Sequence, residues 1–113
     1  MRQNERTVAR KRLDIELRPF RRAAREENLT SGLLRAVRQT LGVPVIEPAA
    51  KMEVACSVIY DMEVGELKNS ITLRSMSRMV QAMGCKVVYG IVPEDEKTLD
   101  EHYERRLWAS VPR

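Results

Sequence analysis

Few side chains in this 113-residue sequence could perform chemistry on a substrate. It contains one histidine, His102, and two cysteines, Cys56 and Cys85, that stand far apart in the chain. A catalytic nucleophile needs a base beside it, and a structural zinc site needs four cysteine or histidine ligands, usually in close pairs. The five glycines never cluster into a phosphate-binding loop. We therefore expect no enzyme activity, no metal site and no cofactor.

Charge is unevenly distributed along the chain. Residues 1–40 carry eleven Lys or Arg and five Asp or Glu, whereas residues 41–113 carry nine and eleven. A basic segment beside a slightly acidic one suggests nucleic acid as a partner. The alternative is a solvated, arginine-rich helix.

Hydropathy and the charges near the N-terminus predict the cellular compartment of the protein. No apolar run is long enough to cross a membrane. Residues 2–18 are charged throughout, unlike a signal peptide. We therefore expect a cytoplasmic protein with no membrane partner.

The apolar spacing predicts a mainly α single domain over residues 1–113. Spacings of three and four residues favour helices. Pro19 should end or bend the first helix, Gly42 should end a later one in a left-handed conformation, and Ser70 should cap another. The expected helices cover residues 5–18, 20–26, 31–41, 44–53, 55–64, 71–83 and a C-terminal stretch within 94–111.

Residues 85–92 (CKVVYGIV) differ from the rest because they are β-branched and aromatic, which predicts one strand. A lone strand leaves its backbone groups unpaired. The same strand of a second copy could pair with it about a two-fold axis. The alternative is an extended tail that packs on the helices. The dimer hypothesis assigns the interface to Val87, Val88, Tyr89, Ile91 and Trp108.

The centre of the chain predicts a helix-turn-helix. Two short helices meet at a tight turn near Glu53, and the residues expected to pack there are small or apolar. These packing residues are Ala49, Met52, Val54, Ile59 and Met62. The second short helix would then be the one presented to a DNA major groove. This divides the domain into a basic helical extension (1–29), a helix-turn-helix core (30–84), a strand (85–93) and a C-terminal helix (94–111).

Residues 30–93 resemble the phage-repressor-like (XRE) helix-turn-helix family, and most of the chain resembles the bacterial group called mobile mystery protein A. The resemblance rests on Leu13-Asp14, Leu17 and Pro19, on residues 32–38 (GLLRAVR), Leu41-Gly42, Met62-Glu63, 71–75 (ITLRS) and 84–93 (GCKVVYGIVP). It implies a five- or six-helix repressor-like domain that regulates transcription. Members of the group are encoded beside a protein with a Fic-type domain, which implies a toxin–antitoxin pair.

The family pattern assigns base contacts to the start of the second short helix. The matching residues here are Cys56, Ser57 and Asp61, with Val58 and Tyr60 nearby. The sequence departs from the family at three positions. Val45 stands where a polar residue usually meets phosphate, Glu53 where the turn usually has glycine, and Ala55 where Ser or Thr usually caps the helix.

The charges around the second short helix do not favour DNA binding. Residues 52–67 contain no Lys or Arg and four acids, although DNA affinity depends on neutralising phosphates. Basic residues outside this helix could supply the phosphate contacts: Arg35, Arg38, Lys51, Lys68, Arg74 and Arg78. Alternatively, Val45, Ile46, Val58 and Tyr60 form an apolar patch that binds a protein partner, or they pack against the N-terminal helix.

Overall fold

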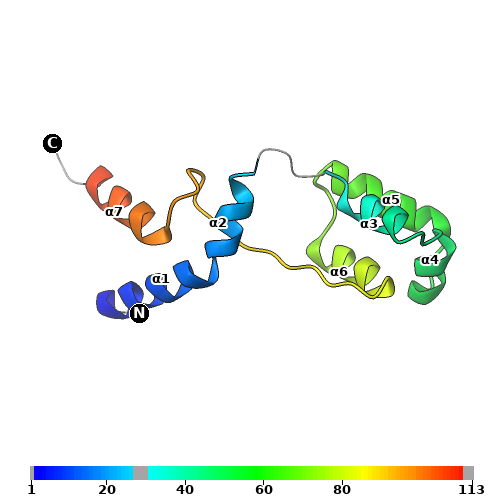
Figure 1. Cartoon of the computed structure of the whole chain (residues 1–113), viewed down its shortest axis with the longest axis horizontal. Coiled ribbons are helices and arrows are strands. Elements are labelled where there is room, and N and C mark those ends of the chain that lie inside the picture. The colour runs from blue at the N-terminus through cyan, green and yellow to red at the C-terminus, as the bar shows by residue number, and fades with distance from the viewer. Residues whose placement is uncertain (1, 27–30, 111–113) are drawn as a thin grey trace. The chain divides into compact units, whose positions relative to one another are not determined.

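The computed structural model describes residues 2–26 and 31–110, and these residues are mainly helical (Figure 1). Their contacts form two compact units. We call residues 31–88 the central unit, and residues 2–26 together with 89–110 the terminal unit. The expected organisation was one domain with residues 1–29 as an extension. The structure instead groups the N-terminal helices with the C-terminal helix.

The central unit consists of four helices around one apolar core. The helices are α3 (Leu33–Thr40), α4 (Ile46–Met52), α5 (Cys56–Leu67) and α6 (Leu73–Ala82). Each contributes at least one buried side chain from an apolar stripe of helical period. The buried apolar residues are Leu34, Val45, Ala49, Ile59, Met79 and Val80. The helices predicted from the apolar spacing are therefore present in this unit, and α5 continues past the predicted end at residue 64.

An ion pair lies inside this core. The Arg38 side chain on α3 and the Glu63 side chain on α5 are 10% and 6% exposed, and their closest N–O distance is 2.8 Å. Arg38 Nε and Nη2 donate to the two Glu63 carboxylate oxygens, and Nη1 donates to the Val43 carbonyl oxygen. Both charges are thus paired, as burial requires. The pair joins α3 to α5.

The helix ends in the central unit are satisfied partly by distant side chains. Glu66 on α5 accepts hydrogen bonds from the backbone N–H groups of Leu33 and Leu34, at 2.9 and 2.7 Å. A carboxylate at this place satisfies orphan donors at the start of α3 and complements the helix dipole. The N-cap of α6 is Thr72 and not the expected Ser70, since Thr72 Oγ1 accepts from the Ser75 N–H. Gly42 follows α3 with a φ of 68°, as predicted.

The expected strand over residues 85–92 is not present, because no described residue is in a β-strand. The segment is extended, and Cys85 and Val87 pack against the central core. Val88, Tyr89 and Ile91 are exposed. A single extended segment has no neighbouring strand within one chain to form a ladder. The β-branched and aromatic residues therefore form an extended tail here.

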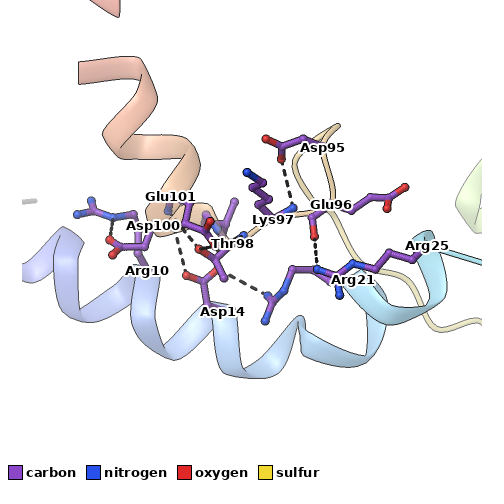
Figure 2. Close-up of polar contacts among 11 residues, drawn as sticks. Arg10, Asp14, Arg21, Arg25, Asp95, Glu96, Lys97, Thr98, Asp100 and Glu101 are labelled. Carbon is purple, nitrogen blue, oxygen red and sulfur yellow. Dashed lines mark hydrogen bonds and ion pairs between the residues drawn. The ribbon is translucent and has the colours of Figure 1, made fainter. Parts of the chain in front are cut away.

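The terminal unit is held by a buried carboxylate. It contains α1 (Gln3–Glu16), α2 (Arg18–Ala24), whose first turn includes Pro19, and α7 (Leu99–Ala109). Asp14 on α1 is 9% exposed and accepts hydrogen bonds from the Leu99 and Asp100 N–H groups (Figure 2). These donors begin α7, where a negative charge is favourable. Asp14 therefore attaches the start of α7 to α1.

Arginines reinforce this attachment (Figure 2). Arg10 Nε lies 3.1 Å from an Asp100 carboxylate oxygen, and its guanidinium lies over the Tyr103 ring, 3.7 Å from the centroid. Such stacking adds a cation–π attraction. Arg25 donates to the Glu96 carbonyl oxygen at 3.1 Å. Basic α1 and α2 thus contact the acidic segment that precedes and begins α7.

We expect Glu63→Ala to destabilise the central unit because it leaves the Arg38 charge buried without a partner. The loss should be about 3 kcal/mol, measured by urea unfolding. Glu47→Ala is the matched control, since Glu47 pairs with Lys51 on the exposed side of α4 and should cost less than about 1 kcal/mol. Equal losses from the two variants would show that the buried pair does not hold the core.

The start of α7 should respond to acid. Hydrogen bonds from the Thr98 side chain and backbone hold the pKa of Glu101 below its ordinary value. A group with a lowered folded-state pKa stabilises the fold fully above its unfolded-state pKa, and loses that contribution as pH falls through the folded-state value. We therefore expect α7 to weaken below about pH 4.5. In an NMR titration, Thr98→Ala should move the Glu101 pKa upward, and an unchanged pKa would contradict this assignment.

Candidate nucleic-acid interface

Helices α4 and α5 are joined by a three-residue turn over residues 53–55. Glu53 adopts a left-handed conformation, with φ of 57° and ψ of 45°. The Val54 N–H donates to the Ala49 carbonyl oxygen at 3.0 Å, which closes the end of α4. Ala55 is the N-cap of α5, without a side-chain capping bond. The turn therefore has a left-handed residue at the position where sequence analysis expected the family's glycine.

The inner sides of the two helices are small or apolar. Ala49 on α4 is 2% exposed and Ile59 on α5 is fully buried. Met52, Val54 and Met62 pack partly buried against the same core. A small residue such as Ala49 lets the two backbones approach closely. All five residues expected to pack at the turn therefore lie in or against the core.

The residues expected to contact bases all lie exposed on α5. Cys56 and Ser57 occupy its first turn, and Asp61 follows Ser57 one helical turn later. Val58 and Tyr60 are 37% and 54% exposed. Side chains four residues apart share a helix face. The structure therefore brings Ser57 and Asp61 together on one polar strip beside the turn.

Two of the four acids near α5 have partners inside the unit. Glu63 is paired with Arg38, and Glu66 accepts the backbone N–H groups of α3. Glu53 and Asp61 remain exposed. One of these four negative charges, that of Glu63, is therefore compensated by a cation. Sequence reasoning assigned no partner to either acid, although Glu63 follows Ile59 by four residues and so falls on the inward stripe.

The basic residues expected to contact phosphate divide into two groups. Arg38 is buried and its donors are used by Glu63 and Val43, so it is not available to a phosphate. This corrects the expectation for Arg38. Lys51 Nζ donates to the Ala82 carbonyl oxygen at 3.1 Å while its side chain stays largely exposed. The remaining expected residues are exposed on the central unit: Arg35, Lys68, Arg74 and Arg78.

The apolar patch proposed for protein binding is only partly exposed. Val45 is 9% exposed and belongs to the core, whereas Ile46 is 65% exposed. Tyr60 also lines a shallow groove of about 290 Å³ between α3 and α5, together with Arg35, Gln39 and Val64. Ile46, Val58 and Tyr60 therefore remain as an apolar surface around the acidic and polar residues of α5.

The residues expected at a dimer interface do not form one surface of the central unit. Val87 packs partly buried against the central core. Val88, Tyr89, Ile91 and Trp108 are each about 70% exposed. Tyr89 and Ile91 line a second hollow within the terminal unit, with Leu13 and Phe20. Val87 and Val88 thus belong to the central unit, whereas Tyr89, Ile91 and Trp108 belong to the terminal unit.

The described ranges contain no group of three or more side chains that could hold a metal ion. None of the helices in the described part of the chain has the length and apolar character needed to cross a membrane. Comparisons with family models, with curated proteins and with solved structures found no match to this chain.

Glu53→Gly should stabilise the central unit. A β-carbon in the left-handed region costs about 1 kcal/mol, so glycine should raise the free energy of unfolding by about this amount, measured by urea unfolding. Glu53→Ala is the matched control because it removes the charge but keeps the β-carbon, and it should give no such gain. If both variants gave the same change, backbone strain at this turn would not be the cause.

Proposed function

We propose that the protein is a DNA-binding transcriptional regulator that inserts the start of α5 into the major groove. One observation carries the proposal: α4, a three-residue turn and α5 present Cys56, Ser57 and Asp61 beside the turn, while Ala49 and Ile59 fill the inner side. Recognition helices of this kind contact base edges with their first residues. Serine bonds to several bases, and a carboxylate accepts from cytosine N4.

Exposed cations of the central unit supply the affinity in this proposal. Arg35, Lys68, Arg74 and Arg78 are free of ion pairs with any described residue, and Lys51 is exposed. Each phosphate that such a cation neutralises releases counterions and steepens the dependence on salt. The pairing of Glu63 with Arg38 supports the same interpretation, because it leaves one carboxylate fewer to repel the phosphates.

The resemblance to the mobile mystery protein A group also suggests what the regulator controls and which protein is its partner. The regulator would act in the cytoplasm as a dimer on two half-sites one DNA turn apart. It would repress its own operon and serve as the antitoxin-like partner of a Fic-domain toxin. Reading the neighbouring gene is the simplest check of that partner.

A second candidate function is a protein-binding antitoxin or adaptor with little DNA binding. The exposed apolar side chains Ile46, Val58 and Tyr60 favour it, since they lie around an α5 that has no Lys or Arg. Groups of exposed apolar residues mark protein interaction sites. This candidate predicts a stable complex with the neighbouring gene product and no preference among DNA sequences.

The primary test compares a duplex from the protein's own upstream region with a scrambled duplex at two salt concentrations, by fluorescence anisotropy. A regulator should prefer its own sequence and lose affinity steeply with salt. Equal, salt-sensitive binding to both duplexes would show only non-specific attraction between the basic residues and DNA. No binding to either would favour the adaptor.

Replacing Ser57 and Asp61 together with alanine should weaken binding to the upstream duplex at least about 30-fold, because each lost base contact costs about 1–3 kcal/mol. Binding to the scrambled duplex should not fall. The matched control replaces Glu104 on α7 and Ser110, the C-cap of α7, which are also exposed. Unchanged affinity of the Ser57/Asp61 variant for the upstream duplex would exclude these residues as base contacts.

A further inference from the structure

Helix α1 has an unusual division between its two faces. The face toward α7 is polar, since Arg10 and Asp14 make the contacts with Asp100 and the α7 backbone (Figure 2). Apolar side chains lie elsewhere on the helix: Val8 is 62% exposed and Leu13 is 43% exposed. An amphipathic helix normally buries its apolar face. The arrangement leaves the apolar side of α1 without a partner in its own unit.

We define the open face of α1 as Glu5, Val8, Ala9, Arg12, Leu13 and Glu16. These residues, together with Asn4, line a shallow hollow of about 530 Å³. A second hollow, of about 570 Å³, shares Leu13 and Glu16 and continues over Phe20 and Ile91. A stable interface needs about 800 Å² from each partner. The second hollow adds to the available area, because one face of a 14-residue helix is small compared with such an interface.

The terminal unit lacks the core that a small folded unit needs. All the buried hydrophobic residues of the described chain, from Leu34 to Val80, belong to the central unit. Units of this size are marginal and are usually completed by disulfides, metals or association. Neither cysteine is in a disulfide, and the described residues hold no metal cluster. A partner surface could therefore cover the open face.

The charges on the open face are complementary to themselves. Glu5 and Arg12 lie seven residues apart, about two helical turns, with Val8 and Ala9 between them. If two copies of α1 cross antiparallel about a two-fold axis near Val8–Ala9, Glu5 of each copy meets Arg12 of the other. A parallel crossing would place like charges together. No salt bridge joins Glu5 or Arg12 to another described residue.

We propose that the open face of α1 is covered by the open face of a second copy, in an antiparallel helix pair. Ala9 lets the helices approach closely at the crossing point, and Val8 and Leu13 supply the apolar contact. The contact is isologous, as expected for a two-fold dimer. It replaces strand pairing as the source of the dimer. It deepens the proposed function by naming the surface that joins the two DNA-binding copies, and its test uses no DNA.

The first experiment measures the mass of the full chain by sedimentation at micromolar concentration. Wild type should be a dimer. Val8→Asp should raise the dimer Kd about 30-fold or more, since it places a charge at the crossing point. Val88→Asp is the matched control, because Val88 is similarly exposed at 68% and lies in the segment once expected to pair. It should remain dimeric. Circular dichroism of each variant confirms that its helices are retained.

A charge exchange tests the antiparallel geometry. Arg12→Glu should weaken the dimer about tenfold by facing Glu5 with a second carboxylate, and adding Glu5→Arg should restore most of the affinity. A monomeric wild type, a dimeric Val8→Asp, or a Val88→Asp that alone dissociates would each overturn the proposal. So would an Arg12→Glu variant that the second change does not rescue.

Discussion

The orientation of α5 depends on the ion pair between Arg38 and Glu63. Two nitrogens of the guanidinium meet the two carboxylate oxygens, and the third nitrogen meets the Val43 carbonyl oxygen. A planar fork of this kind fixes direction as well as distance. Any rotation of α5 about its own axis would pull Glu63 away and leave both charges buried without partners, which is costly. The exposed strip with Ser57 and Asp61 is therefore fixed by a contact on the opposite side of the same helix.

The two units are stabilised by different kinds of contact. The central unit has an apolar core from four helices, and its charged pair lies within that core. The terminal unit is joined by Asp14 at the start of α7 and by Arg10, which contacts both Asp100 and Tyr103. The Asp14 and Arg10 side chains are largely buried, so these contacts fix the geometry of the terminal unit, but they do not replace an apolar core. The terminal unit, and not the central one, is therefore where we propose a partner.

The sequence predicts those parts of the fold that depend on local chemistry. Periodicity indicates the helices, Gly42 takes the left-handed conformation expected after α3, and Ala49 and Ile59 lie inside as their spacing indicates. The helix expected over residues 55–64 continues in α5 to Leu67. Residues 85–92 show the limit of a β-branched and aromatic composition, which favours an extended chain whether or not a second strand is present.

Several contacts that sequence reasoning missed join residues far apart in the chain. Asp14 reaches the backbone of Leu99, and Glu66 reaches that of Leu33. Local rules expect a cap from the residue at the helix end itself. Arg38 was assigned to phosphate because its type suggests a surface cation, although its spacing from Leu34 places it on the buried stripe. For charged residues in this chain, position on the helix face predicts the role better than residue type.

The same reasoning explains how an acidic α5 is compatible with DNA binding. Glu63 and Glu66 act inside the unit, so Asp61 is the exposed acid on the strip with Ser57. One carboxylate at a base edge can select cytosine, whereas it contributes nothing to general attraction. Such a helix would give selectivity with low affinity per copy. Joining two copies turns the second contact into an intramolecular step at high effective concentration. In the proposed regulator, a recognition helix of low affinity would therefore depend on a second copy, which the proposed dimer face of α1 would supply.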